Sequence, residues 1–186
     1  MVVVPYQSRR ETDMKTYVEF GASNPSSRNM SYFKIAKILG YKTIVIDFRK
    51  YDFMDEEIYK LLVDETHLNY WSDPLDIPLA NSWTCISSLE HTPYSDVHKE
   101  VEAIASKVNG RGDIGIDLTD HSGGFDHVES PEDFQKHFSA QFYLNGIGYE
   151  QWIDIISEYF TFSKIEEVYC KDQVGNITFK NCESKK

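Results

Sequence analysis

The sequence predicts an α/β fold in which a mostly parallel sheet lies between two layers of helices. Strand-like and helix-like segments alternate along nearly the whole chain of 186 residues. Residues 43–46 are wholly apolar, which is typical of a short strand buried on both faces. Two strand-like segments near the end, joined by a turn, predict a hairpin that adds one antiparallel strand. The expected sheet has seven strands.

The first half of the chain contains three predicted strands and two predicted helices. Residues 16–20 form a strand that a glycine ends, and the apolar residues of 32–39 recur at helical spacing up to a second glycine. The buried strand at 43–46 follows. Acids in the first turn of 55–63 favour a helix, and 67–71 is a candidate third strand.

The second half continues the alternation and closes with the hairpin. Its predicted elements are a strand at 84–87, a helix at 96–108, a strand at 113–118, a helix at 152–159, and hairpin strands at 165–169 and 177–179. Residues 119–148 are expected to be irregular. We find no repeat or linker, so the prediction is one domain over 1–186, with an irregular segment at 1–14 and a charged tail at 183–186.

Composition and charge disfavour several classes of partner. Thirty acidic residues against 19 basic ones leave a formal net charge of −11, which disfavours nucleic acids and anionic membrane surfaces. No apolar run approaches the length that spans a bilayer. The three cysteines are widely spaced and form no Cys-x-x-Cys motif, so we expect no disulfide framework and a reducing, cytoplasmic location.

Two neighbouring predicted strands end in residues suited to a nucleoside. Ligands of parallel α/β sheets bind at the carboxyl ends of the strands. The turn at 19–23 places Gly21 before a helix, where free backbone N–H groups gather, and Asp47 ends the next strand, where a carboxylate can accept both ribose hydroxyls. The alternative is that Gly21 only ends a strand and Asp47 only caps a turn.

A longer pattern covers residues 73–91. It begins with Asp73 and an Ile-Pro-Leu run at 77–79, and continues through a polar turn, Trp83, a strand and a Leu-Glu-His run at 89–91. With the turn at 19–23, Asp47 and a Gly-Arg-Gly turn at 110–112, it resembles the class I S-adenosylmethionine-dependent methyltransferases over about residues 16–180. The resemblance implies a Rossmann-like three-layer sandwich.

The resemblance also implies a cofactor, S-adenosylmethionine, and a role for each matching residue. Glu19, Gly21, Ala22 and Ser23 would pass under its methionine part, and Asp47 would bind the ribose hydroxyls. Asp73 would accept from the adenine amino group, with Pro74 or Leu75 beside the ring, and Ser87 and Ser88 would lie near the sulfonium. The implied reaction is methyl transfer to a small-molecule or sugar acceptor, expected at a hydroxyl. The sequence predicts neither the acceptor's identity nor an oligomeric state.

The first turn departs from the family pattern, which usually has two or three glycines. Gly21 alone remains, and Ser23 and Pro25 stand where later glycines are common. A Cβ at Ser23 can crowd a cofactor, because glycine allows the closest backbone approach. This departure favours an alternative in which the domain is catalytically silent and serves as a binding module. A nicotinamide enzyme is a third interpretation, since Gly21 and Asp47 alone also suit a dinucleotide.

Histidines near the predicted pocket are candidate bases. His121, oriented by Asp120, follows the fifth strand, and His91 follows the fourth. Imidazole takes up a proton near neutral pH, which suits removal of a hydroxyl proton during methyl transfer. A divalent metal held by this Asp- and His-rich segment, or a solvated turn, are the alternatives; the residues concerned are Asp117, Asp120, His121, Asp126 and His127.

Overall fold

The computed structural model describes residues 14–22, 30–119, 145–170 and 173–186. The elements of the first half are β1 (Thr16–Phe20), α1 (Met30–Ile38), β2 (Lys42–Asp47), the 3₁₀ turn η2 (Asp52–Asp55), α2 (Glu57–Leu62), β3 (Glu65–Leu68) and β4 (Ala80–Ile86). Those of the second half are the 3₁₀ turns η3 (Leu89–His91) and η4 (Tyr94–Asp96), α3 (Val97–Ser106), β5 (Val108–Asp117), α5 (Tyr149–Tyr159), β6 (Phe160–Thr161), β7 (Lys164–Cys170) and β8 (Gln173–Ser184).

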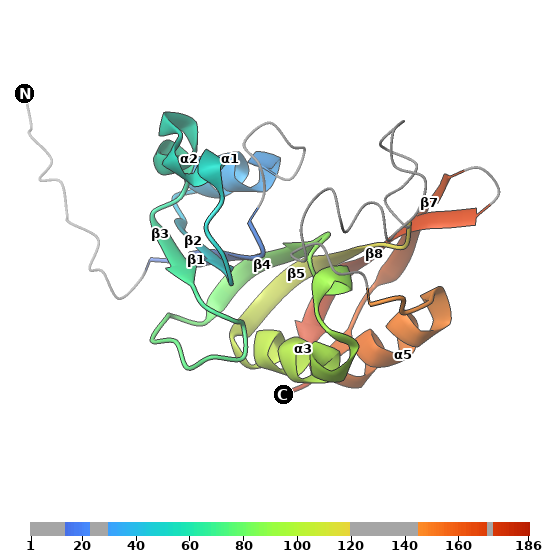
Figure 1. Ribbon diagram of the computed structural model, residues 1–186. Helices are drawn as coiled ribbons and strands as arrows, with labels where there is room; N and C mark the ends of the chain where they lie inside the picture. Colours follow the sequence, from blue (N-terminus) through green and yellow to red (C-terminus); the bar gives the residue numbers. More distant parts are fainter. Residues whose placement is uncertain (1–13, 23–29, 120–144, 171–172) are drawn as a thin grey trace, which may run out of the picture.

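The strands form one sheet in the order β3-β2-β1-β4-β5-β8-β6, and β7 pairs with β8 outside this path. Strands β1 to β5 pair in parallel, whereas β8 runs antiparallel to β5, β6 and β7. Helices α1 and α2 cover one face, and α3 and α5 cover the other (Figure 1). The predicted three-layer α/β fold is therefore confirmed. Within the described ranges, every helix is too short or too polar to cross a membrane.

Glycines explain why β5 begins earlier than predicted. The Gly-Arg-Gly run at 110–112, expected to be a turn, is part of the strand. A Cβ at Gly110 would lie 1.9 Å from the Asn81 carbonyl oxygen, and one at Gly112 would lie 2.2 Å from the Trp83 ring. These glycines therefore allow β4, with the indole of Trp83, to pack closely against β5, and they do not break β5.

Several other boundaries also differ from the sequence prediction. β4 begins at Ala80, four residues before the expected strand, and β8 covers Gln173–Ser184 where 177–179 was expected. β3 begins at Glu65, two residues before the expected strand. The predicted helix at 55–63 is the shorter α2, preceded by the turn η2. At the end of the chain, Glu183 and Ser184 were expected in a charged tail, but they pair with the two-residue strand β6, which is an additional, eighth strand.

The hydrophobic core lies on both faces of the sheet. As a result, β1 is buried along its whole length. Val18 and Phe20 join the larger cluster under α3 and α5, in which Trp83 and Trp152 are the largest buried side chains. Tyr17 points to the opposite face and packs edge-on against Phe33 of α1, with ring centroids 5.1 Å apart. The alternation of side chains along β1 thus divides the core into two layers.

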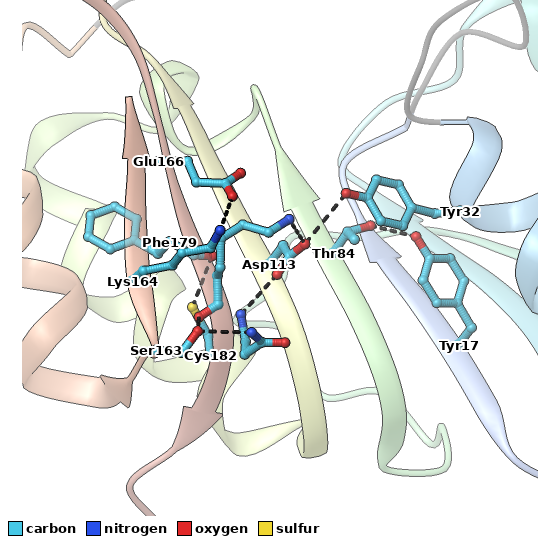
Figure 2. A network of polar contacts seen from close by, with 11 residues as sticks. Tyr17, Tyr32, Thr84, Asp113, Ser163, Lys164, Glu166, Phe179 and Cys182 are labelled. Carbon is cyan, nitrogen blue, oxygen red and sulfur yellow. Dashed lines mark hydrogen bonds and ion pairs between the residues drawn. The ribbon is translucent and has the colours of Figure 1, made fainter. Parts of the chain in front are cut away.

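A polar network joins strands to α1 on the face that α1 covers (Figure 2). The hydroxyl oxygens of Tyr17 and Thr84 lie 2.6 Å apart and share a hydrogen bond between β1 and β4. Asp113 of β5 accepts a hydrogen bond from the Tyr32 hydroxyl at 3.5 Å and forms an ion pair with Lys180 of β8. The Asp113 carboxylate therefore connects β5, β8 and α1.

Candidate functional site

A cavity of about 190 Å³ lies where β1, β2 and β4 end. Six residues predicted from the sequence line it: Gly21, Ala22, Asp47, Ser87, Ser88 and His91. The others in its wall are Phe48, Arg49, Tyr51, Phe53 and Trp71. The structure thus brings together residues from three strand ends that are separated by up to 70 positions in the sequence, as expected for the carboxyl edge of a parallel sheet.

Gly21 allows the first turn to pass close to the end of β4. Its φ of 92° is in the left-handed region, and its N–H donates to the Ile46 carbonyl oxygen at 2.8 Å. A Cβ at this position would lie 2.0 Å from the Ser88 hydroxyl oxygen. Conformation and space therefore both require glycine here.

Asp47 connects the turn after β1 to the end of β2. Its Oδ2 accepts a hydrogen bond from the Ala22 N–H at 2.7 Å, and its Oδ1 accepts one from the Arg49 N–H at 3.1 Å. Burial raises the pKa of Asp47 above its ordinary value, although these N–H donors and the Arg49 charge oppose the shift. The backbone donors of Ala22 and Arg49 hold the carboxylate in one orientation, and the Phe48 N–H also acts to lower its pKa.

The end of β4 is strained at the cavity. Ser87 has a φ of 50°, which non-glycine residues seldom adopt, and its N–H donates to the Gly115 carbonyl oxygen at 2.9 Å. The Ser88 hydroxyl donates to the Ile86 carbonyl oxygen at 3.2 Å. Strain of this kind persists where the surroundings enforce it, often at ligand sites.

The aromatic and arginine part of the wall was missed by the sequence analysis. The Trp71 indole N–H donates to the Ile46 carbonyl oxygen at 3.2 Å and holds the ring at the cavity. The Arg49 guanidinium lies 4.2 Å from the centre of the Tyr51 ring. The available signal was the run of aromatic residues at 48–53, directly after the aspartate that ends β2.

Three predicted cofactor residues do not line this cavity. Asp73 accepts a hydrogen bond from the Tyr70 N–H at 3.1 Å and so closes a local turn. Pro74 is exposed beside it. Glu19 is buried on the α1 side of β1, where the Tyr17 hydroxyl donates to its carboxylate at 3.4 Å.

Some of the predicted residues lie outside the described part of the chain: Ser23, Pro25, Asp120, His121, Asp126 and His127. Asp117, at the end of β5, is described, and its carboxylate accepts hydrogen bonds from the backbone N–H and hydroxyl of Thr119. Among the residues with described positions, no three His, Cys, Asp or Glu side chains form a group suited to a metal ion.

Glu90 is a second buried acid near this edge, and the sequence analysis assigned it no role. Its Oε1 accepts a hydrogen bond from the Asp117 N–H at 3.4 Å, and its Oε2 has no hydrogen-bond partner among the described residues. Burial, and secondarily the Asp117 charge, raise the pKa of Glu90 to about 8. At neutral pH this carboxyl group is therefore largely protonated.

Comparison with known proteins finds similarity in structure alone. No family model and no curated protein matches the sequence. The Burkholderia thailandensis 1,6-didemethyltoxoflavin-N1-methyltransferase, solved with S-adenosylhomocysteine, has a TM-score of 0.62 and 11% identity, covering 94% of this chain and 73% of that one. The Synechocystis magnesium protoporphyrin IX methyltransferase has a TM-score of 0.60 and 11% identity, with coverages of 94% and 76%.

A third similar structure, from Rhodobacter sphaeroides, is described as a Zn-dependent alcohol dehydrogenase. Its TM-score is 0.61 at 12% identity, and the match covers 93% of this chain and 85% of that one. At such identities the likeness concerns the fold, and the choice of cofactor depends on the cavity residues. The chain has the fold of the class I S-adenosylmethionine-dependent methyltransferases.

Proposed function

We propose that this protein transfers a methyl group from S-adenosylmethionine to a hydroxyl of a small molecule or sugar. One observation carries the proposal: the Asp47 carboxylate, the turn at Gly21 and the Ser87–Ser88 end of β4 face one cavity at the carboxyl edge of the sheet. The structural neighbours described as methyltransferases support the cofactor class, because they share the overall fold and were solved with S-adenosylhomocysteine.

Asp47 suits the ribose of the cofactor. A carboxylate offers about four acceptor positions, and the N–H groups of Ala22 and Arg49 use one on each oxygen. The Phe48 N–H also interacts with the carboxylate, which therefore keeps about one acceptor direction for a ribose hydroxyl. In this proposal the two backbone bonds orient the carboxylate before the cofactor arrives.

The aromatic wall suits the adenine end. Phe48 and Trp71 border the cavity next to Asp47, and a flat apolar surface favours a purine ring. Phe48 also stacks on Tyr70, with ring centroids 5.8 Å apart and planes inclined by 6°. Because Asp73 closes the turn beside Tyr70, we infer that it shapes this aromatic end, and contact of Asp73 with the adenine amino group stays a prediction.

The cofactor, when bound, supplies an electrophilic methyl group on its sulfonium. The protein must hold the acceptor in line, exclude water and take up the hydroxyl proton. We propose His121, oriented by Asp120, as the base, with His91 as the alternative. His91 lies in the cavity wall.

The small-molecule acceptor follows from two observations. The acidic charge of the chain opposes a polyanionic substrate. The two methyltransferase neighbours are named for small molecules, a toxoflavin precursor and a protoporphyrin. We infer that the acceptor of this chain belongs to the same broad class.

Calorimetry with S-adenosylhomocysteine tests the cofactor proposal. Asp47→Ala should abolish binding, because it removes the ribose acceptor, while thermal unfolding shows whether the variant is folded. Asp55→Ala is a charge-matched control, since Asp55 is exposed, pairs with Lys50 and does not line the cavity. Unchanged affinity in Asp47→Ala would overturn the proposed site.

A second experiment separates the base from the binding residues. His121→Ala should leave S-adenosylhomocysteine affinity intact and slow methyl transfer at least about tenfold, the lower range of general-base effects. An undiminished rate in His121→Ala would assign the role of general base to His91. The rate of His91→Ala then tests that assignment.

A panel of cofactors separates the three candidate functions. The methyltransferase proposal expects binding of S-adenosylmethionine and its demethylated product, and none of NAD or NADP. The reverse pattern would establish the nicotinamide interpretation. Absence of binding to all four would favour a catalytically silent binding module.

A further inference from the structure

Asn145 joins the beginning of the α5 region to the turn η3 through three hydrogen bonds. Its backbone N–H donates to the Glu90 carbonyl oxygen at 2.9 Å. Its side-chain amide donates to the carbonyl oxygens of Leu89 at 2.9 Å and Thr92 at 3.1 Å. Three backbone carbonyls of one short turn are thus bound by a single distant residue.

The turn that Asn145 holds carries one wall of the cavity. Ser88 precedes η3 and His91 ends it, and both line the cavity. The backbone bonds from His91 N–H to the Ser88 carbonyl oxygen and from Thr92 N–H to the Leu89 carbonyl oxygen, each at 3.1 Å, are of the weak 3₁₀ type. Burial of Leu89 and Glu90 fixes the inner side of this turn, and the bonds from Asn145 bind its backbone carbonyls.

An amide at position 145 supplies two donors for the carbonyl oxygens of Leu89 and Thr92. Both N–H donors are used, and its Oδ1 accepts a hydrogen bond from the Ile147 N–H at 3.2 Å, which fixes which way the amide faces. An aspartate could accept from Ile147 but would place a negative charge against two carbonyl oxygens. An alanine would leave the carbonyls of Leu89 and Thr92, both buried residues, without these donors.

We propose that Asn145 is a positioning residue: its side-chain amide holds the turn η3 so that Ser88 and His91 stay in place at the cofactor cavity. This inference rests on the proposed function, because it assigns Asn145 a role in the same site. The residue does not line the cavity and acts through the turn.

The test combines two measurements on Asn145→Ala and Asn145→Asp. We expect S-adenosylhomocysteine affinity to fall roughly tenfold or more, equivalent to about one lost hydrogen bond. We also expect the NMR resonances of the His91 ring to shift or broaden without ligand, while those of His98, exposed on α3, stay unchanged.

Asn81→Ala is the matched control. Asn81 also forms hydrogen bonds between distant segments, to the Thr16 N–H at 2.9 Å and to Asn109, but it lies at the amino end of β4. Asn81→Ala should lower the free energy of unfolding and leave both the S-adenosylhomocysteine affinity and the His91 resonances unchanged. A purely structural role for Asn145 would make the two variants behave alike, and that result would overturn the proposal.

The outcomes distinguish the inference from the proposed function. If the unmodified protein binds no S-adenosylhomocysteine, the proposed function fails, and the His91 resonances still decide whether Asn145 positions the turn. If the unmodified protein binds it and Asn145→Ala changes neither affinity nor these resonances, the proposed function stands and the role of Asn145 is refuted.

Discussion

Gly21 occupies a position where both the backbone and a neighbouring side chain exclude a Cβ. We predict that Gly21→Ala lowers the free energy of unfolding by about 2 kcal/mol or more and weakens binding of S-adenosylhomocysteine. Denaturant unfolding and calorimetry measure the two effects. The Ser88 hydroxyl must move, and Ser88 belongs to the cavity wall.

Gly40 provides the control for this substitution. Its φ is 77°, but nothing lies within 4 Å of the Cβ that an alanine would place there. Gly40→Ala therefore has the backbone strain without the collision and should be the milder change. The double variant Gly21→Ala with Ser88→Gly should recover part of the loss, and strict additivity of the two changes would contradict the proposed collision.

Glu90 makes stability depend on pH. Its pKa rises from 4.5 to about 8 on folding, so the folded state keeps a proton that the unfolded state releases. The contribution of the protonated Glu90 carboxyl to the free energy of unfolding is complete below pH 4.5 and is lost as the pH rises toward 8. We predict that the free energy of unfolding of Glu90→Gln exceeds that of the unmodified protein by a margin that grows as the pH rises through this range.

Urea unfolding at several pH values measures this difference. Glu56→Gln is the control, because Glu56 is exposed and its side chain caps no helix. A stability gap between Glu90→Gln and the unmodified protein that is the same at pH 4.5 and pH 8 would show that Glu90 does not hold the extra proton.

At the level of strands and helices, the Asp113 carboxylate is a shared acceptor. It receives hydrogen bonds from Tyr32 of α1, Lys180 of β8 and the Asn181 N–H at 3.0 Å (Figure 2). We predict that Asp113→Ala lowers the unfolding free energy by about 1 to 3 kcal/mol, the usual cost of leaving such donors unpaired.

This loss should leave the cofactor cavity unaffected. Asp113 does not line that cavity, so S-adenosylhomocysteine affinity should stay within about twofold of the unmodified value when both proteins are folded. Calorimetry below the unfolding temperature checks this, and a large loss of affinity would mean that the network and the cavity are coupled.

Elements with a strong local pattern were predictable. β1 matches its prediction at both ends, because Gly21 follows it directly, and β2 differs by one residue at each end, because its apolar residues 44–46 are consecutive. β5 was not predictable at its start, since the glycines of 110–112 are required by Asn81 and Trp83 of the neighbouring strand. Those contacts are visible only once β4 and β5 lie side by side.

Over the whole molecule, ligand binding and folding are linked. The proposed function predicts that S-adenosylhomocysteine at one hundred times its dissociation constant raises the unfolding free energy by about 2.7 kcal/mol. Thermal unfolding measures the shift, and Asp47→Ala should show none. An equal shift in both proteins would mean that the ligand binds somewhere other than the Asp47 cavity.

The candidate site was partly predictable. Asp47 was found because it ends an apolar strand, a position that reaches the carboxyl edge of a parallel sheet. The adenine role of Asp73 came from the resemblance; its carboxylate accepts from the Tyr70 N–H, and the contact with adenine stays a prediction. Trp71 was missed because nothing local distinguishes a cavity aromatic from a core one, and Arg49 was missed although aromatic residues flank it at 48 and 51.

Periodicity and the alternation of strands with helices can be recognised in short segments, so the sequence already implied the layers, the parallel strands and the edge at which a ligand binds. The closeness of Gly21 to Ser88, the bond from Ala22 to Asp47 and the hydrogen bonds from Asn145 to η3 arise only after packing. Each joins residues at least 25 positions apart, and a single contact over that separation leaves no repeating pattern to read.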